Sequence, residues 1–282
     1  MPAEPPIDTP QGLFEAYERL AAGPTRPIAG GTDVMVAITG ELGPIPERML
    51  DLSRLEDLRG ISLEPGRLIL GARTTYTEIR RSALCREHLP ALVEAAATIG
   101  AAQIQNRGTI GGNVANASPA GDTLPVLLAT DAVILVGGQR GERQIPAAEF
   151  FLDYRKTALA PDELILQVQL PLPRGREVRF RKVGTRRAQA ISKVVLALAW
   201  RDVDGWSNVR IALGSVAATP IRATATEAVL EGSRPTPEVA DRAAETLANE
   251  LQPIDDVRST ADYRRAVAAR VLHRLLREAG GW

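Results

Sequence analysis

The segment that most constrains how this chain can fold is residues 108–123, GTIGGNVANASPAGDT, which is rich in small and polar residues and has one charged side chain, Asp122. It runs directly into an apolar stretch, LPVLLATDAVILV, at 124–136. A loop in solvent normally carries lysine or glutamate, whereas small residues beside a core let the backbone approach another group closely. The segment therefore indicates either a tight backbone turn or a ligand that lies against the main chain.

A second glycine pair occurs in AGGTD, residues 29–33, directly after a short apolar run. Paired glycines can direct successive N–H groups at one anion, and threonine and asparagine can add side-chain donors. Two such segments facing each other could hold a pyrophosphate without lysine or arginine. Neither matches the G-x-G-x-x-G or the G-x-x-x-x-G-K-[ST] fingerprint. The alternative, that both are tight turns at strand ends, stays open at this point.

The first part of the chain mixes short strands and helices without a regular alternation. Thr9 and Pro10 predict the start of a helix, and the apolar spacing over 90–106 predicts another. Strands are expected within the segments 26–38, 49–72, 131–151 and 163–171. This irregular order favours an α+β fold over a doubly wound parallel sheet.

The composition changes at PLPRGREV, residues 171–178, where we place a domain boundary. Beyond it we expect a basic loop over 179–187 and two strands near 193–203 and 207–216. A chain of 282 residues has room for two such domains, at about 150 residues each.

The tail of the chain is predicted to be helical. Thr236 followed by Pro237 is a good helix start, because the hydroxyl can cap and proline fits the first turn. The last helix, roughly 260–278, is predicted to bury one face, with these residues at helical spacing: Tyr263, Val267, Val271 and Leu275. Trp200, Trp206 and Trp282 are expected to be core or packing residues.

Charge and residue counts exclude several kinds of site. The 34 basic and 34 acidic side chains cancel, so the chain has no electrostatic footprint for nucleic acid or an anionic membrane. A single cysteine, Cys85, excludes an iron–sulfur cluster or a cysteine-ligated zinc held by this chain alone. Two distant histidines, His88 and His273, form no local metal motif. Without a signal peptide or an apolar run of about 18 residues, we expect a soluble, cytoplasmic protein.

In the two glycine segments the sequence resembles the FAD-binding (medium) subunits of the molybdenum hydroxylases, the family of xanthine dehydrogenase, aldehyde oxidoreductase and carbon monoxide dehydrogenase. AGGTD at 29–33 and TIGGNVANASPAGDTLP at 109–125 match in the right order. Three further motifs extend the resemblance over essentially the whole chain: GARTTYTEI at 71–79, FFLDYRKTALAPDELILQVQLP at 150–171 and FRKVGTRRAQAISKV at 180–194.

The resemblance implies a two-lobed FAD-binding domain of the PCMH (vanillyl-alcohol-oxidase-like) type over residues 1–174, with lobes of about 1–57 and 58–174. It implies a small α+β C-terminal domain over 175–282, with a short antiparallel sheet and a helical bundle. FAD is expected to bind non-covalently between the lobes, with its pyrophosphate held by the two glycine segments.

Individual residues carry over from the same resemblance. The implied cofactor-binding residues of the two segments are Ala29, Gly30, Gly31, Thr32, Asp33, Val34, Thr109, Gly111, Gly112 and Asn113. Asp122 matches a carboxylate at the nucleotide end of FAD, and Lys182 matches a lysine near the isoalloxazine ring. Ile99 and Ile165 match apolar positions beside the flavin. No catalytic residue of the chain itself is expected, because the flavin carries the chemistry.

One departure bears on the electron acceptor. Thr185, Arg186 and Arg187 stand where the carbon monoxide dehydrogenase-like branch carries a tyrosine over the flavin, so this loop is closer to the xanthine dehydrogenase pattern. An arginine pair can assist an anionic dinucleotide, which favours NAD⁺ as the acceptor. The alternative is that both arginines pair with acids of a partner chain or stay solvated.

By resemblance, the complex hydroxylates its substrate at a molybdenum cofactor in a large subunit and passes electrons through [2Fe–2S] clusters of a small subunit to FAD in this chain. The assembly implied is a dimer of heterotrimers. Two alternatives remain: a stand-alone flavoprotein oxidase, which needs its own substrate pocket and base, and a scaffold subunit that has lost its flavin. The intact glycine pairs, Asn113 and Asp122 argue against the scaffold.

Overall fold

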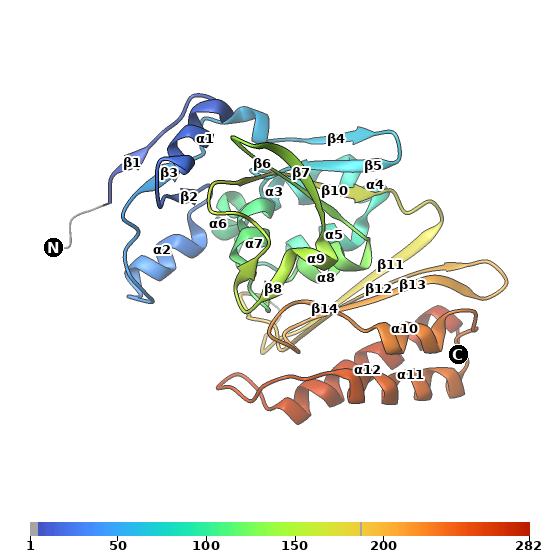
Figure 1. Ribbon diagram of the computed structural model, residues 1–282. Coiled ribbons are helices and arrows are strands. Elements are labelled where there is room, and N and C mark those ends of the chain that lie inside the picture. Colours follow the sequence, from blue (N-terminus) through green and yellow to red (C-terminus); the bar gives the residue numbers. More distant parts are fainter. Residues whose placement is uncertain (1–4, 187) are drawn as a thin grey trace.

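The computed structural model describes residues 5–186 and 188–282, so Arg187 lies outside the described residues (Figure 1). The strands form three sheets of three, five and four strands and one small hairpin, with helices packed between and below them. Most strand pairs are antiparallel, and only the three-stranded sheet is parallel. This mixture of helices and short antiparallel sheets confirms the α+β prediction.

The N-terminal sheet has the order β1-β3-β2. Its strands and helices are β1 (Ile7–Asp8), α1 (Leu13–Ala21), β2 (Arg26–Ile28), α2 (Thr32–Thr39) and β3 (Met49–Asp51). Helix α1 buries Ala16 and Leu20 in a small core shared with Leu50 and with Leu164 of β10 (Leu164–Pro171). Helix α2 buries no residue and stands at the edge of the molecule (Figure 1).

The five-stranded sheet has the order β4-β5-β10-β6-β7. Its other strands are β4 (Ile61–Glu64), β5 (Arg67–Gly71), β6 (Val133–Gly138) and β7 (Gly141–Pro146), and the small hairpin is β8 (Phe151–Asp153) with β9 (Lys156–Thr157). A 3₁₀ turn covers Glu56–Leu58. The helices that accompany this sheet are α3 (Tyr76–Arg81), α4 (Ala83–His88), α5 (Pro90–Ala97), α6 (Ala102–Arg107), α7 (Ile110–Asn116), α8 (Leu124–Ala129) and α9 (Ala147–Phe150). Figure 1 shows them between this sheet and the C-terminal one.

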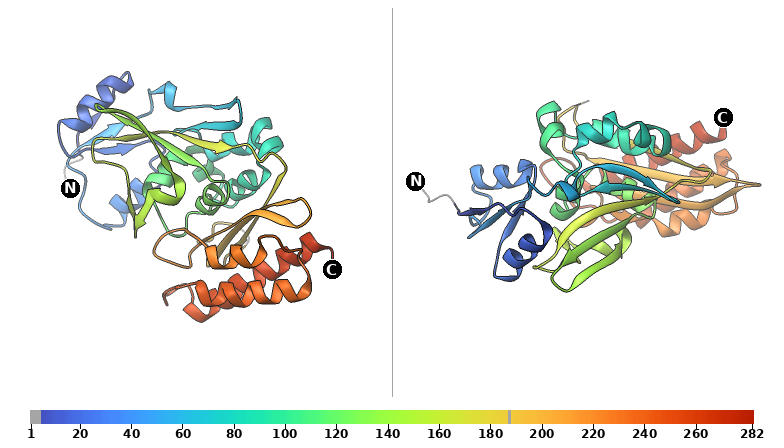
Figure 2. Two further views of the ribbon diagram at one scale, coloured as in Figure 1. Left: turned by 45° about the vertical axis from the view of Figure 1, so that its right-hand side comes forward. Right: turned by 90° about the horizontal axis from the view of Figure 1, so that it is seen from above.

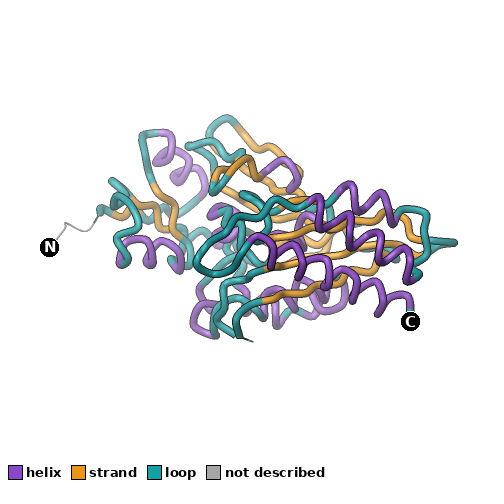
Figure 3. The backbone as a smooth tube through the Cα atoms, turned by 90° about the horizontal axis from the view of Figure 1, so that it is seen from below, coloured by secondary structure: helices purple, strands orange, loops and turns teal. Residues whose placement is uncertain are grey.

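The C-terminal sheet has the order β11-β12-β13-β14, and all its pairs are antiparallel. Its strands are β11 (Arg176–Val183), β12 (Val194–Asp202), β13 (Trp206–Gly214) and β14 (Ile221–Arg222). Three helices follow: α10 (Thr224–Leu230), α11 (Pro237–Glu250) and α12 (Ala261–Gly280). They lie together on the outer side of the sheet, and α11 and α12 run along its strands (Figures 2 and 3).

The two faces of the C-terminal sheet belong to different cores. Val195, Ala197, Ala199 and Ala212 join the core of the five-stranded sheet and its helices. The alternate residues of β12 and β13, with Leu196, Leu198, Trp200 and Ile211 among them, join the core of α10–α12. Because side chains of a strand point alternately to opposite faces, one sheet separates these two cores.

Several elements differ from the prediction. Helix α1 begins at Leu13 after Gly12, so Thr9 and Pro10 do not start it. The predicted helix over 90–106 is broken into α5 and α6, since Gly100 takes a left-handed conformation with φ of +49° between them. Much of the predicted basic loop over 179–187 is strand β11, whose charged residues concealed the alternation of buried Phe180 with polar neighbours.

The predicted helices after Thr236 and near the end of the chain are present, and Thr236 and Thr260 cap them by accepting a hydrogen bond from the backbone. The buried face of α12 contains the predicted Val267, Val271 and Leu275, whereas Tyr263 is 43 % exposed. Ala268 and Leu272 complete this face. Trp200 and Trp206 are buried and stacked at 4.5 Å, and Trp282, which is 38 % exposed, packs edge-on against His273 at 5.5 Å. Among the described residues, no helix is long and apolar enough to cross a membrane.

Candidate functional site

The two glycine segments of the sequence meet in space. A Cβ atom on Gly30 would lie 1.8 Å from the carbonyl oxygen of Arg107, immediately before Gly108. Gly31 has a φ of +74° and forms the N-cap of α2. Both positions therefore need glycine, Gly30 for the close approach of two backbones and Gly31 for its left-handed conformation.

The start of helix α2 offers free backbone donors beside this contact. Met35 N–H bonds to Gly31 O at 2.9 Å, and no side chain caps the helix. Within the described residues, the N–H groups of Thr32, Asp33 and Val34 have no acceptor. An uncapped helix start presents a partial positive charge and donors to an anion.

The second glycine segment uses its donors within the protein. Gly111 N–H donates to Ala72 O at 2.9 Å and Gly112 N–H donates to Thr109 Oγ1 at 3.1 Å. A Cβ on Gly111 would lie 2.6 Å from the Cβ of Ala72. These glycines thus allow the segment to pack on residues 72–76, and the free donors for an anion come mainly from the first segment.

A cavity of about 250 Å³ lies where the two segments meet. Its lining residues are Ala29, Gly30, Ser53, Arg59, Arg73, Thr75, Asn106, Arg107 and Thr109. Arg59 is tied to Glu78 at 2.8 Å, and Arg73 donates to Leu55 O at 2.7 Å, which holds both guanidinium groups in place. Three arginines therefore make the cavity suited to an anionic ligand.

These arginines were not among the predicted site residues. The sequence did contain a signal, because Arg73 lies within the GARTTYTEI motif and Arg107 directly precedes Gly108. That a pyrophosphate could be held without arginine stays a prediction, and three arginines line the same cavity as Ala29 and Gly30.

Asp122 and Lys182 form a buried ion pair. Lys182 Nζ lies 2.5 Å from Asp122 Oδ2, and the two side chains are 10 % and 7 % exposed. Lys182 Nζ also donates to Thr98 O at 3.1 Å, and Thr98 Oγ1 donates to Asp122 Oδ2 at 3.2 Å. Burial raises the pKa of Asp122, and Lys182 opposes that rise.

The second oxygen of this carboxylate, Asp122 Oδ1, is buried and has no hydrogen-bond partner within the described residues. A buried carboxylate oxygen without a donor is costly. Asp122 and Lys182 were predicted to serve opposite ends of FAD, whereas the ion pair brings the two side chains together at one point.

Tyr76 links the two glycine segments electrostatically, although the sequence did not single it out. Its side chain is 2 % exposed, and burial, followed by the charges of Asp33 and Asp122, raises its pKa far above that of free tyrosine. Thr123, whose hydroxyl partly opposes this rise in pKa, donates to Asn113 Oδ1 at 2.7 Å. Asn113 is thus held at the end of a buried polar network.

The predicted apolar residues lie elsewhere in the same region. Ile165 is buried in β10 opposite Val136, and it lines neither of the two cavities described here. Ile99 is partly buried against the main core. It directly precedes Gly100, which lines a second cavity of about 410 Å³. That cavity is lined by Gly100, Ala101, Gln103, Ile104, Gln189, Ala190 and Ile191.

The loop beside the second cavity contains Arg186. Its guanidinium group donates to Gln189 O at 3.0 and 2.7 Å, which keeps it folded back on its own loop. No group of three histidine, cysteine, aspartate or glutamate side chains among the described residues could hold a metal. Cys85 is buried.

Comparison with known proteins agrees with this arrangement. A family model for the "FAD binding domain in molybdopterin dehydrogenase" matches residues 7–173, and one for the "CO dehydrogenase flavoprotein C-terminal domain" matches 179–279. The chain is 31 % identical to the carbon monoxide dehydrogenase medium chain of Hydrogenophaga pseudoflava, over 83 % of this chain and 82 % of that relative. It is 30 % identical to the xanthine dehydrogenase FAD-binding subunit of Escherichia coli O157:H7, over 95 % of both chains.

A solved structure of carbon monoxide dehydrogenase from Hydrogenophaga pseudoflava superimposes with a TM-score of 0.95 at 30 % identity, covering 100 % of this chain and 99 % of that one. The chain therefore belongs to the FAD-binding medium subunits of the molybdenum hydroxylases, the oxidoreductase family that includes xanthine dehydrogenase and carbon monoxide dehydrogenase.

Proposed function

We propose that this chain binds FAD non-covalently along a path from the cavity between the glycine segments to the Asp122–Lys182 pair. The observation that carries the proposal is the meeting of Gly30 with Arg107 beside a cavity that three arginines line. The unpartnered Oδ1 of Asp122 supports it further, because a bound ligand with a hydroxyl or N–H group supplies the missing donor.

In this arrangement the diphosphate lies at the start of α2. The N–H groups of Thr32, Asp33 and Val34 and the guanidinium of Arg107 face its charge. The cofactor lies against a surface formed by both glycine segments, with these residues: Ala29, Gly30, Thr109, Gly111, Gly112 and Asn113. Gly31 supplies the turn that directs the helix start towards it.

Asp122, Lys182, Ile99 and Ile165 are assigned to the flavin part of the path. Lys182 pairs with Oδ2 of the buried carboxylate, which leaves Oδ1 to accept from the cofactor. The apolar side chains exclude water from this part of the site. FAD, when bound, supplies the redox chemistry, and the chain positions it.

We further propose that the chain receives electrons from [2Fe–2S] clusters of a small subunit, after substrate hydroxylation at the molybdenum cofactor of a large subunit, and passes them to NAD⁺. The relatives support a place in a complex of several subunits, since they are named as medium chains or FAD-binding subunits. Identities of 31 and 30 % to the two branches do not separate them. The preference for NAD⁺ depends on the Arg186 loop beside the second cavity.

The remaining expectations stay predictions. A division into residues 1–174, with lobes near 1–57 and 58–174, and residues 175–282 is supported by two family-model matches that end and begin close to that point. A dimer of heterotrimers and a cytoplasmic location rest on the family resemblance alone.

The test is a visible absorption spectrum of the full chain after incubation with FAD and desalting. Arg107→Ala is expected to weaken FAD binding about tenfold or more, because a charge-assisted hydrogen bond is lost. Arg140→Ala is the matched control, since Arg140 is 71 % exposed in a hairpin turn and does not line the cavity.

Bleaching of the retained flavin bands by NADH would support NAD⁺ as the acceptor, whereas retained bands that NADH leaves unchanged would contradict it. A chain that retains no flavin, with Arg107→Ala indistinguishable from Arg140→Ala, would favour the scaffold alternative. Oxidation of a small alcohol or acid by the isolated chain would instead favour a stand-alone oxidase.

A further inference from the structure

Helix α8 has an acid just outside each end and no polar side chain within Leu124–Ala129 itself. Every residue from Leu124 to Ala129 is buried, and the helix packs on β12 and β13. Asp122 lies just before its first turn and Asp131 just after its last. Apolar contacts are not directional, so they define the position of a short apolar helix on a sheet less sharply than ion pairs do. The acids at its two ends are the groups that can fix its position.

Strand β11 has a basic residue near each end, which matches the acids that flank α8. Arg176, Val178, Phe180 and Lys182 alternate along the strand and therefore share one face. The two apolar residues join the main core, and the two cations lie at the strand ends, separated by about 20 Å of extended chain. Lys182 pairs with Asp122 and Arg176 pairs with Asp131 at 3.1 Å, so α8 is attached to β11 at both ends.

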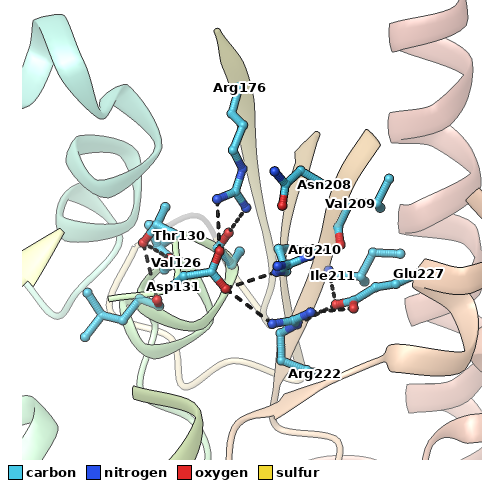
Figure 4. Close-up of polar contacts among 12 residues, drawn as sticks. Val126, Thr130, Asp131, Arg176, Asn208, Val209, Arg210, Ile211, Arg222 and Glu227 are labelled. Carbon is cyan, nitrogen blue, oxygen red and sulfur yellow. Dashed lines mark hydrogen bonds and ion pairs between the residues drawn. The ribbon is translucent and has the colours of Figure 1, made fainter. Parts of the chain in front are cut away.

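Asp131 is the centre of a larger cluster (Figure 4). Arg210 of β13 lies 3.0 Å and Arg222 of β14 lies 3.4 Å from its Oδ1, while Arg176 also donates to Ala129 O at 2.7 Å. Arg222 is held in turn by Glu227 at 2.5 Å. One carboxylate thus joins three strands of the C-terminal sheet to the end of α8. Without it, Arg176 and Arg210 would have no carboxylate partner among the described residues, and Arg222 would keep only Glu227.

The local structure does not favour an aspartate at this position. Asp131 has a φ of +53° and closes α8 in a Schellman motif, with Ala132 N–H bonded to Leu127 O at 2.9 Å and Asp131 N–H to Leu128 O at 3.2 Å. Glycine or asparagine is the usual residue there, and an acid at a helix C-terminus opposes the helix dipole. A residue that is unfavourable locally and satisfied only by distant arginines indicates a role in tertiary positioning.

We propose that Asp131 is a positioning residue for the flavin site: its three arginine contacts fix α8 on the C-terminal sheet, and this holds Asp122 against Lys182 at the other end of the helix. The FAD part of this inference rests on the proposed function. The positioning part concerns the chain alone and can be tested without FAD.

The experiment compares Asp131→Asn with Asp204→Asn in the full chain. Asparagine suits the left-handed backbone at both sites, and Asp204, with a φ of +55°, makes no ion pair with a described residue. The readout is acylation of lysine followed by mass spectrometry. The chain has three lysines, and Lys156, which is 72 % exposed, serves as the internal reference for Lys182, which is 10 % exposed.

In Asp131→Asn the labelling of Lys182 relative to Lys156 is expected to rise about tenfold, the size of a typical coupling between linked sites. Alkylation of the buried Cys85 reports global unfolding and should not rise. The dissociation constant for FAD should increase by a similar factor, while Asp204→Asn changes neither quantity.

An unchanged ratio of Lys182 to Lys156 labelling in Asp131→Asn would overturn the inference. A rise in this ratio accompanied by an equal rise in Cys85 alkylation would also overturn it, because it would report global unfolding. If the ratio rises as expected but the wild-type chain binds no FAD, the proposed function fails and the positioning role stands. If wild-type binds FAD and Asp131→Asn binds it equally well with Lys182 still protected, the proposed function stands and this inference fails.

Discussion

The two faces of the C-terminal sheet are packed in different ways. The face towards α10–α12 carries leucine, isoleucine and tryptophan side chains, which interlock with three helices. The face towards α8 carries Ala197, Ala199 and Ala212, which let α8 come close but bury little apolar area. Charged groups are correspondingly concentrated at the ends of α8, as Asp122–Lys182 and Asp131–Arg176.

The difference separates stability from cofactor binding. Large interdigitating side chains stabilise in proportion to the area that they bury. The small residues that face α8 bury less apolar area. The ion pairs at the ends of α8 define its position on the sheet, because charged and hydrogen-bonded contacts are directional. We therefore expect substitutions on the two faces to affect different measurements.

The largest effect on stability is expected from Leu198→Ala on the face towards α10–α12. The fully buried side chain leaves a cavity, so the free energy of unfolding should fall by about 3 kcal/mol. Urea denaturation measures this. The affinity for FAD should stay within about twofold of wild type, because α8 contacts the other face. A loss of FAD as severe as the loss of stability would show that the two faces are not independent.

Ala197→Leu, on the face towards α8, is expected to lower both the stability and the affinity for FAD. The added side chain has no space, and overpacking should lower the free energy of unfolding by about 2 kcal/mol. Displacement of α8 should also weaken FAD binding, which a fluorescence titration measures. Ala199→Ser is a small, matched change on the same face. If Ala197→Leu leaves FAD affinity unchanged, the position of α8 does not matter for the cofactor.

Stability above pH 10 should depend on Tyr76, which lies on the α8 side. Burial raises its pKa, so the folded protein keeps a proton that the unfolded chain loses above pH 10. This stabilising contribution is complete below pH 10 and is lost as the pH rises, by about 1.4 kcal/mol per pH unit. The free energy of unfolding, measured by denaturation at pH 9 and pH 11, should fall less between these pH values for Tyr76→Phe than for wild type. Equal losses would place the titration on another group.

The smallest effect is expected for Arg179→Ala, on β11 between Arg176 and Lys182. Arg179 pairs with Glu177 at 2.7 Å, but both side chains are more than half exposed. Exposed pairs of this kind contribute about 0.5 kcal/mol or less. Chemical denaturation and FAD titration should therefore both resemble wild type, which distinguishes this pair from the buried pairs at the ends of α8.

Much of the candidate site was predictable where the signal was local. The glycine pairs at 30–31 and 111–112 indicated close backbone approach, and both make such approaches. The strand over 163–171 and the hairpin within 131–151 were predicted from alternation and turn residues and are present. The strand β11 was missed because its exposed charges masked the alternation of Val178 and Phe180.

Other features required the tertiary structure. The grouping of Arg59, Arg73 and Arg107 around one cavity joins three separate segments, and no local pattern announces it. Asp131 resembles any acid in a turn until Arg176, Arg210 and Arg222 are seen around it.

The glycine positions and most of the strands could be predicted from the sequence, because backbone conformation and burial pattern depend on residues within a few positions of each other. The cofactor was implied by the resemblance of the motifs to a known family. The pairing of Asp122 with Lys182, 60 residues away, and the attachment of α8 at both of its ends became visible in the folded chain alone. Such pairs depend on how whole helices and strands pack, and that packing is the sum of many contacts that no short segment contains.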